Sequence, residues 1–137
     1  MSVFPLRLAT AIGSVLIGAI HLRLYFDSYR DIDDVGRSFI LNAVAAGVAA
    51  VIVLLWPSRL AFFAPLVVAN ATLVAFGLSR TDQGIFNFSE RGWNPSPDAV
   101  LAVVVEIVTA VLAVVGLVLA GARRAESAAP PGALGSP

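Results

Sequence analysis

The sequence contains no cysteine, no lysine and only one histidine. The absence of cysteine excludes disulfide bonds, thiolate metal sites and cysteine nucleophiles. One histidine cannot by itself ligate a zinc site or a bis-histidine haem within one chain. Charge is also scarce, at 13% of residues, where a soluble domain carries about a quarter. The formal net charge is zero, so no electrostatic argument favours binding to nucleic acid.

Long apolar runs take the place of charge, and 58% of the residues are hydrophobic. A bilayer core of about 30 Å is crossed by roughly 20 residues of apolar helix. Four segments meet this requirement, at approximately residues 6–26, 38–56, 60–79 and 99–120. The first is too long for a signal peptide and lacks a small-residue cleavage site before the charges that follow it. The pattern therefore predicts an all-α, membrane-embedded four-helix bundle over residues 1–122.

The rest of the chain, residues 123–137, contains "ESAAPPGALGSP". Such a Pro-, Gly-, Ser- and Ala-rich segment is typical of disorder, and we expect a disordered cytoplasmic tail. Four spans place both termini on one side of the membrane. The count of arginines is four on that side against five on the other, which gives no bias. The arginines on the side of the termini have almost no acidic neighbours, which favours cytoplasmic termini and a location in the plasma membrane. Dual topology is the alternative.

Each predicted span contains one conspicuous polar side chain, namely His21, Asn42, Asn70 and Glu106. At about 1.5 Å of rise per residue, all four lie roughly 6 to 13 Å from the end that carries the two longer loops. A polar layer at one depth is a functional hypothesis by default, because ionisable groups are costly inside a membrane. We expect this layer in the outer half of the bundle, although Pro65 can kink the third span and rotate Asn70.

Helical spacing places these side chains on stripes of small and polar residues. The stripes are Ser14, Gly18, His21 and Tyr25 in the first span, Ser38, Asn42, Ala45 and Ala49 in the second, and Ala102, Glu106, Thr109, Ala113 and Gly116 in the fourth. Such stripes line helix contacts in membranes. His21, Asn42 and Glu106 are therefore predicted to face each other, and the candidate ligand-binding residues are His21, Tyr25, Asn42, Asn70 and Glu106.

Three interpretations of the layer stay open at this point. It is a set of structural hydrogen bonds between helices, a small polar pocket that holds a ligand or exchanges a proton, or a metal or haem site that takes His21 from two subunits. The acidic loop "DIDDVG" lacks the spacing and terminal Glu of an EF-hand, so no metal ligands are assigned. The sequence names no cofactor.

The stretches "HLRLYFDSYRDIDDVGRSFILNAVAAG" and "GIFNFSERGW" resemble those of small four-span membrane proteins of actinobacteria. The resemblance implies no known activity. It singles out His21, Tyr25, Tyr29, Arg30, Gly36 and Asn42 as residues to test.

Three functional hypotheses follow. The first is an accessory or ligand-binding membrane protein that acts alone, as a homo-oligomer or within a larger membrane complex. The second is an oligomeric, proton-coupled small transporter that uses Glu106. The third is a membrane redox protein that binds quinone or haem near His21. The lack of catalytic motifs favours a role other than catalysis.

Overall fold

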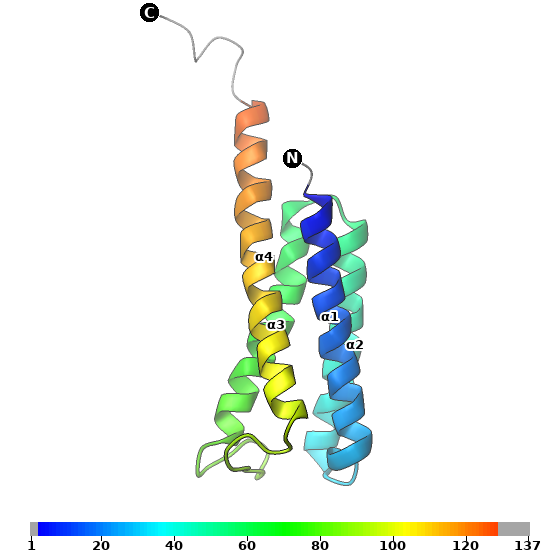
Figure 1. Cartoon of the computed structure of the whole chain (residues 1–137), viewed down its shortest axis with the longest axis vertical. Helices are drawn as coiled ribbons and strands as arrows, with labels where there is room; N and C mark the ends of the chain where they lie inside the picture. The colour runs from blue at the N-terminus through cyan, green and yellow to red at the C-terminus, as the bar shows by residue number, and fades with distance from the viewer. Residues whose placement is uncertain (1–2, 129–137) are drawn as a thin grey trace, which may run out of the picture.

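Four long helices run side by side in alternating directions (Figure 1). The structure is a computed structural model that describes residues 3–128, with side chains through residue 122. Its elements are α1 (Phe4–Leu24), the π-helical turn η1 (Tyr25–Tyr29), α2 (Asp33–Leu55), the 3-10 turn η2 (Arg59–Phe62), α3 (Phe63–Ser79) and α4 (Asp98–Ala128). The predicted all-α four-helix bundle is confirmed.

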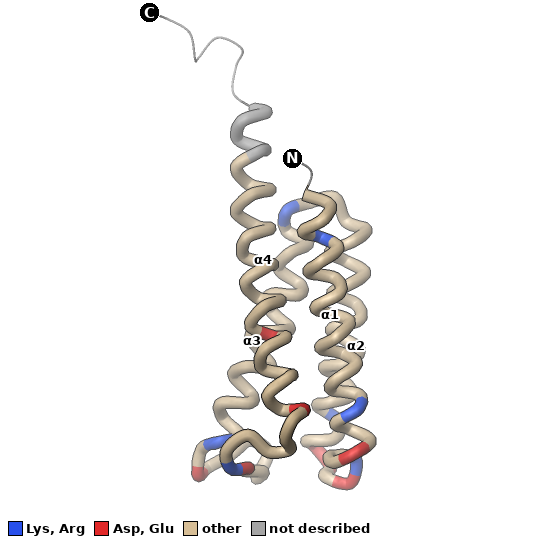
Figure 2. The backbone as a smooth tube through the Cα atoms, in the orientation of Figure 1, with Lys and Arg blue, Asp and Glu red and all other residues tan. Residues whose placement is uncertain are grey.

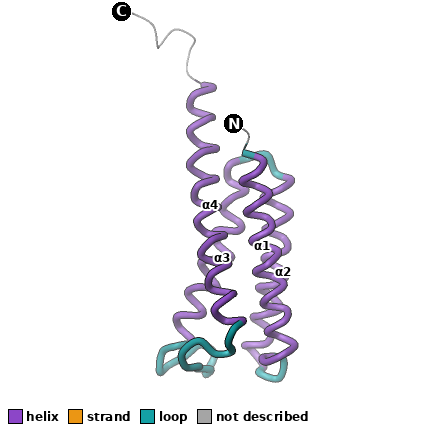
Figure 3. The backbone as a smooth tube through the Cα atoms, in the orientation of Figure 1, coloured by secondary structure: helices purple, strands orange, loops and turns teal. Residues whose placement is uncertain are grey.

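The connections gather at the two ends of the bundle (Figure 3). We call the end that carries η1 and residues 80–97 the loop end, and the opposite end, where the chain begins, the terminus end. Helix α4 continues through Ala128, past the boundary that the sequence predicted at residue 122. The remainder of the predicted tail, residues 129–137, lies outside the described residues.

Local sequence accounts for the helix boundaries. Pro5 lies in the first turn of α1, where its missing N–H costs no hydrogen bond. Asp33 and Asp34 lie in the first turn of α2, and Asp98 lies in the first turn of α4. The positive end of the helix dipole stabilises carboxylates at these positions. Pro57 follows the end of α2 and cannot continue it.

Each of the four helical segments is long and apolar enough to cross a membrane. The segments are Phe4–Tyr29, Asp33–Leu55, Arg59–Ser79 and Asp98–Ala122. Their outer faces expose large apolar side chains, such as Leu55 at 78%, Val74 at 62% and Val118 at 63%. Charged residues gather at the two ends, and few lie along the helices between them (Figure 2). Apolar surfaces of this extent suit lipid rather than water, and the chain is a multi-pass membrane protein.

The terminus half of the bundle is filled. Ala11, Val53, Phe62 and Ala113 form a buried cluster there. Arg7 is only 6% exposed, and its guanidinium donates hydrogen bonds to the carbonyl oxygens of Val53 at 2.9 Å and Ser58 at 3.0 Å and to that of Trp56. A cation at the negative end of a helix dipole is favourable, so Arg7 closes the C-terminus of α2.

A close approach of backbones joins α1 to α4. A Cβ atom at Gly13 would overlap the hydroxyl of Thr109 and lie 3.2 Å from its Cβ. Thr109 is fully buried, and its hydroxyl donates to the carbonyl oxygen of Val105 at 2.7 Å. Small residues permit such contacts between membrane helices, and this one holds the polar face of α1 against that of α4.

We predict that Gly13→Val destabilises the bundle by about 1–3 kcal/mol, because the added side chain forces α1 away from Thr109. Gly47→Val is the matched control, since a Cβ atom there meets nothing within 4 Å. Both substitutions remove one helical glycine, so backbone entropy cancels in the comparison. Thermal unfolding in detergent micelles measures the difference. Equal stability of the two variants would contradict the close approach.

Candidate functional site

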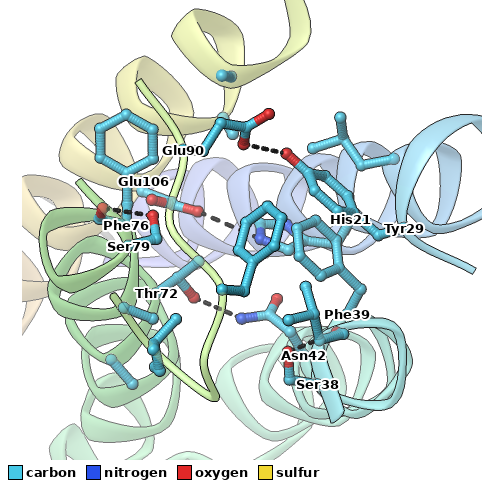
Figure 4. A pocket seen from close by; sticks show the side chains of 18 of the residues that line it. His21, Tyr29, Ser38, Phe39, Asn42, Thr72, Phe76, Ser79, Glu90 and Glu106 are labelled. Carbon is cyan, nitrogen blue, oxygen red and sulfur yellow. Dashed lines mark hydrogen bonds and ion pairs between the residues drawn. The ribbon is translucent and has the colours of Figure 1, made fainter. Parts of the chain in front are cut away.

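A cavity of about 440 Å³ lies in the loop-end half of the bundle. Each of the four helices contributes at least one polar side chain to its wall, including His21 from α1, Asn42 from α2, Thr72 from α3 and Glu106 from α4 (Figure 4). The rest of the lining is mostly apolar. The inward faces that the sequence predicted for His21, Asn42 and Glu106 are thus confirmed, whereas Thr72 was not predicted.

His21 faces Glu106 across the cavity wall. The side chain of His21 is 5% exposed, and its Nδ1 lies 2.9 Å from the carbonyl oxygen of Ile17. A carbonyl oxygen only accepts hydrogen bonds, so Nδ1 carries a hydrogen and the other ring nitrogen of a neutral imidazole is an acceptor. This Nε2 lies 3.7 Å from Oε1 of Glu106, which is too long for a hydrogen bond.

Glu106 is the most deeply buried acid of the described residues, at 1% exposure. Neither of its carboxyl oxygens has a hydrogen-bond partner among the described residues. Burying a carboxyl group without partners costs free energy, so such groups are rare in natural structures and call for an explanation. Glu106 is thus the side chain with the most unused bonding capacity in the cavity.

Asn42 also presents an unused acceptor. Its amide nitrogen donates a hydrogen bond to the hydroxyl of Thr72, and that hydroxyl donates to the carbonyl oxygen of Val68 at 2.9 Å. Because the only hydroxyl hydrogen of Thr72 is used, the group facing it must be the NH₂ of Asn42. The amide oxygen of Asn42 consequently has no partner among the described residues.

The cavity reaches the outer surface between α2 and α3. Leu41 of α2 and Val67 of α3 both line it, and they are 70% and 62% exposed. Leu41 lies eight residues beyond Asp33, where α2 begins, which corresponds to about 12 Å of helix. The opening therefore lies in the apolar part of α2, a helix long and apolar enough to cross a membrane.

The connection between α3 and α4 folds over the loop end, and its exposed Phe86 is one of the residues that line the cavity. Tyr29 donates a hydrogen bond of 2.6 Å to Glu90, and Arg80 lies 3.4 Å from the same carboxylate oxygen. Arg80 also donates to the carbonyl oxygens of Gly92 and Asn94, both at 2.7 Å. These bonds hold the connection against η1 and the end of α3. We call Tyr29, Arg80 and Glu90 the loop-end latch.

Two candidate residues from the sequence lie elsewhere. Asn70 is exposed on the outer face of α3 and donates only to the carbonyl oxygen of Leu66, at 2.8 Å. Tyr25 lies in a separate surface groove with Arg30 and Arg37. The predicted face of Tyr25 is wrong because the α-helix gives way to the π-helical turn at that residue. The wider turn brings Tyr29 into the cavity wall in its place.

Gly36 permits this arrangement at the start of α2. A Cβ atom there would lie 2.6 Å from the carbonyl oxygen of Tyr29, closer than any real side chain. Its role is therefore to let α2 pack directly on the π-helical turn. The resemblance noted from the sequence had singled out both Gly36 and Tyr29 without giving a reason.

Thr72 and the latch residues Arg80 and Glu90 were missed as site residues. A threonine in an apolar span is a weak signal, because its hydroxyl can bond to its own helix. Arg80 and Glu90 look like ordinary loop charges until the connection folds back. Among the described residues, no group of three or more His, Asp or Glu side chains could hold a metal ion.

Comparison of the chain with protein-family models, with curated proteins and with solved structures finds no match. The resemblance to small four-span actinobacterial proteins therefore stays a prediction. Any proposal about function rests on the geometry of the cavity.

The latch makes a prediction of its own. Tyr29→Phe removes the hydroxyl that donates to Glu90, a bond to a charged acceptor worth about 1.5–3 kcal/mol. We expect faster backbone amide hydrogen exchange in residues 81–94 and unchanged exchange in the helices. Tyr25→Phe is the control, since the hydroxyl of Tyr25 makes no hydrogen bond to the described residues. Unchanged exchange of the connection in Tyr29→Phe would show that the latch does not hold it.

Proposed function

We propose that this protein binds a small, lipid-soluble molecule in the cavity between its four helices. The molecule reaches the cavity from the bilayer, between α2 and α3, with its polar group toward His21, Asn42 and Glu106. The observation that carries the proposal is the combination of unpartnered buried polar atoms with a wall that opens at Leu41 and Val67. Ligand sites typically are apolar concavities with a few convergent polar groups.

The closed terminus half favours binding over transport by a single copy. The cluster around Phe62 and the bonds of Arg7 fill that half, and the cavity ends near Glu106. A proton-coupled transporter would need a second copy to build a path across the membrane. The haem form of the redox hypothesis is weaker, because a haem would need a second axial ligand from another copy of His21, whereas a quinone belongs to the proposed class of lipid-soluble ligands.

Filling the cavity tests the proposal. Nile red, a neutral lipid-soluble dye, should bind saturably to the protein in nanodiscs, above its partitioning into empty nanodiscs. Ala45 lines the cavity, and Ala45→Phe should weaken binding about tenfold or more by occupying the space, a loss of about 1.4 kcal/mol. Val48 is on the same helix and exposed, so Val48→Phe serves as the control and should bind like the wild type.

Two results would contradict the proposal. One is a dye signal that rises without saturation, as in empty nanodiscs. The other is equal binding by the Ala45→Phe and Val48→Phe proteins.

The proposed location is the plasma membrane with both termini in the cytoplasm. The count of arginines gives no bias, but Arg7 and Arg59 at the terminus end have almost no acidic neighbours in the sequence, whereas the arginines of the loop end are mixed with acidic residues; this asymmetry supports the orientation. A reporter fused after residue 124 should be active only in the cytoplasm, and a tag at Gln83 should react with an impermeant reagent from outside. Labelling of both sites from both faces would instead show dual topology.

A further inference from the structure

The buried side-chain atoms of the cavity that lack any partner among the described residues are all hydrogen-bond acceptors when Glu106 is ionised. The two oxygens of Glu106 and the amide oxygen of Asn42 lack partners among the described residues, and Nε2 of a neutral His21 is an acceptor by the argument above. These atoms accept hydrogen bonds. The hydroxyls in the wall are already committed as donors: Tyr29 to Glu90, Ser38 to Val35, Thr72 to Val68 and Ser79 to Phe76.

Among the residues whose side chains the structure describes, no arginine pairs with this carboxylate. The sequence has no lysine, and Arg7 is bound at the terminus end. Arg23 pairs with Asp27 and Asp98, while Arg80 pairs with Glu90. The remaining ion pairs of the described residues, Arg30 with Asp31 and Arg37 with Asp34, are exposed.

From these observations we infer that the ligand is a lipophilic amine, bound as its ammonium ion with an N–H group directed at Glu106. This inference rests on the proposed function and specifies its ligand. An ammonium ion supplies several donors and a positive charge, which in a site of low dielectric strengthens the attraction to a carboxylate. Its apolar body suits the apolar lining, which includes Phe39, Phe76 and Phe88.

The distance between His21 and Glu106 suits a shared donor. Nε2 and Oε1 are 3.7 Å apart, so one nitrogen atom can lie about 2.8 Å from both, at ordinary hydrogen-bond length. The amide oxygen of Asn42 supplies an acceptor from a third helix. Aromatic faces add to this selectivity, because they attract cations and not anions.

Displacement of Nile red by a matched series of ligands tests the inference. The series is octylamine, octan-1-ol, octyltrimethylammonium and octanoate, which share one chain and differ in charge and N–H or O–H donors. Octylamine should displace the dye from the wild type at a concentration about tenfold lower than octan-1-ol, because charge-assisted hydrogen bonds are stronger than neutral ones. Octyltrimethylammonium, which has the charge without the N–H donor, should be weaker than octylamine, and octanoate should be weakest.

Glu106→Gln should remove the advantage of octylamine over octan-1-ol, because the amide keeps the size of the side chain without its charge. Asn70→Ala is the control, since Asn70 is polar and within a helix but faces outward, and it should leave the ranking unchanged. Equal displacement by octylamine and octan-1-ol in the wild type, or displacement by octanoate as strong as by octylamine, would overturn the inference. Both comparisons need only the wild-type protein, so they stand even where Glu106→Gln does not fold.

The outcomes separate this inference from the proposed function. If the dye and octan-1-ol bind saturably and without preference for the amine, the cavity binds lipid-soluble molecules and the inference about charge is wrong. If neither the dye nor any member of the series binds saturably, the proposed function itself is wrong.

Discussion

The burial of Glu106 is the constraint on which the rest of the structure depends. A charged carboxylate at this depth costs at least about 2.5 kcal/mol unless it is paired or hydrated, and a protein of this size has only about 5–15 kcal/mol of stability. Tight contacts elsewhere offset the free-energy cost of burying Glu106. Examples are the contact of Gly13 with Thr109 and the hydrogen bonds of Arg7 to the end of α2. The carboxyl group thus stays at the edge of a cavity and is not absorbed into a closed core.

The two sides of the bundle differ in how they pack. Helices α1 and α4 meet through small residues, which bring His21 to within 3.7 Å of Glu106. Helices α2 and α3 are joined at the cavity by the bond between Asn42 and Thr72, and beside that bond the wall opens at Leu41 and Val67. One tight pair of helices and one loose pair together produce a site that is rigid at its polar end and accessible from lipid.

Periodicity alone predicted the four helices and the inward faces of His21, Asn42 and Glu106, because small and polar residues in an apolar helix mark the side that faces protein. Periodicity failed where the α-helix gives way to the π-helical turn and where the connection between α3 and α4 folds back over the bundle. In a continuous α-helix the spacing of Tyr25 from His21 would place it on the inward face. The π-helical turn instead brings Tyr29 to the cavity wall. Asn70 is polar and yet faces outward, since a bond to Leu66 satisfies its amide locally. The pairing of Tyr29 with Glu90 joins residues 61 positions apart, which no local pattern encodes.

Chemical modification of Glu106 from the lipid phase tests the central claim most directly. Dicyclohexylcarbodiimide is a lipid-soluble reagent that modifies carboxyl groups in apolar surroundings, and a water-soluble carbodiimide is its matched control. The account predicts that mass spectrometry of the folded protein in nanodiscs finds Glu106 modified by the lipid-soluble reagent and spared by the water-soluble one, with the modification absent in Glu106→Gln. A folded protein in which Glu106 resists the lipid-soluble reagent, while carboxylates at the loop end react with the water-soluble one, would contradict the account.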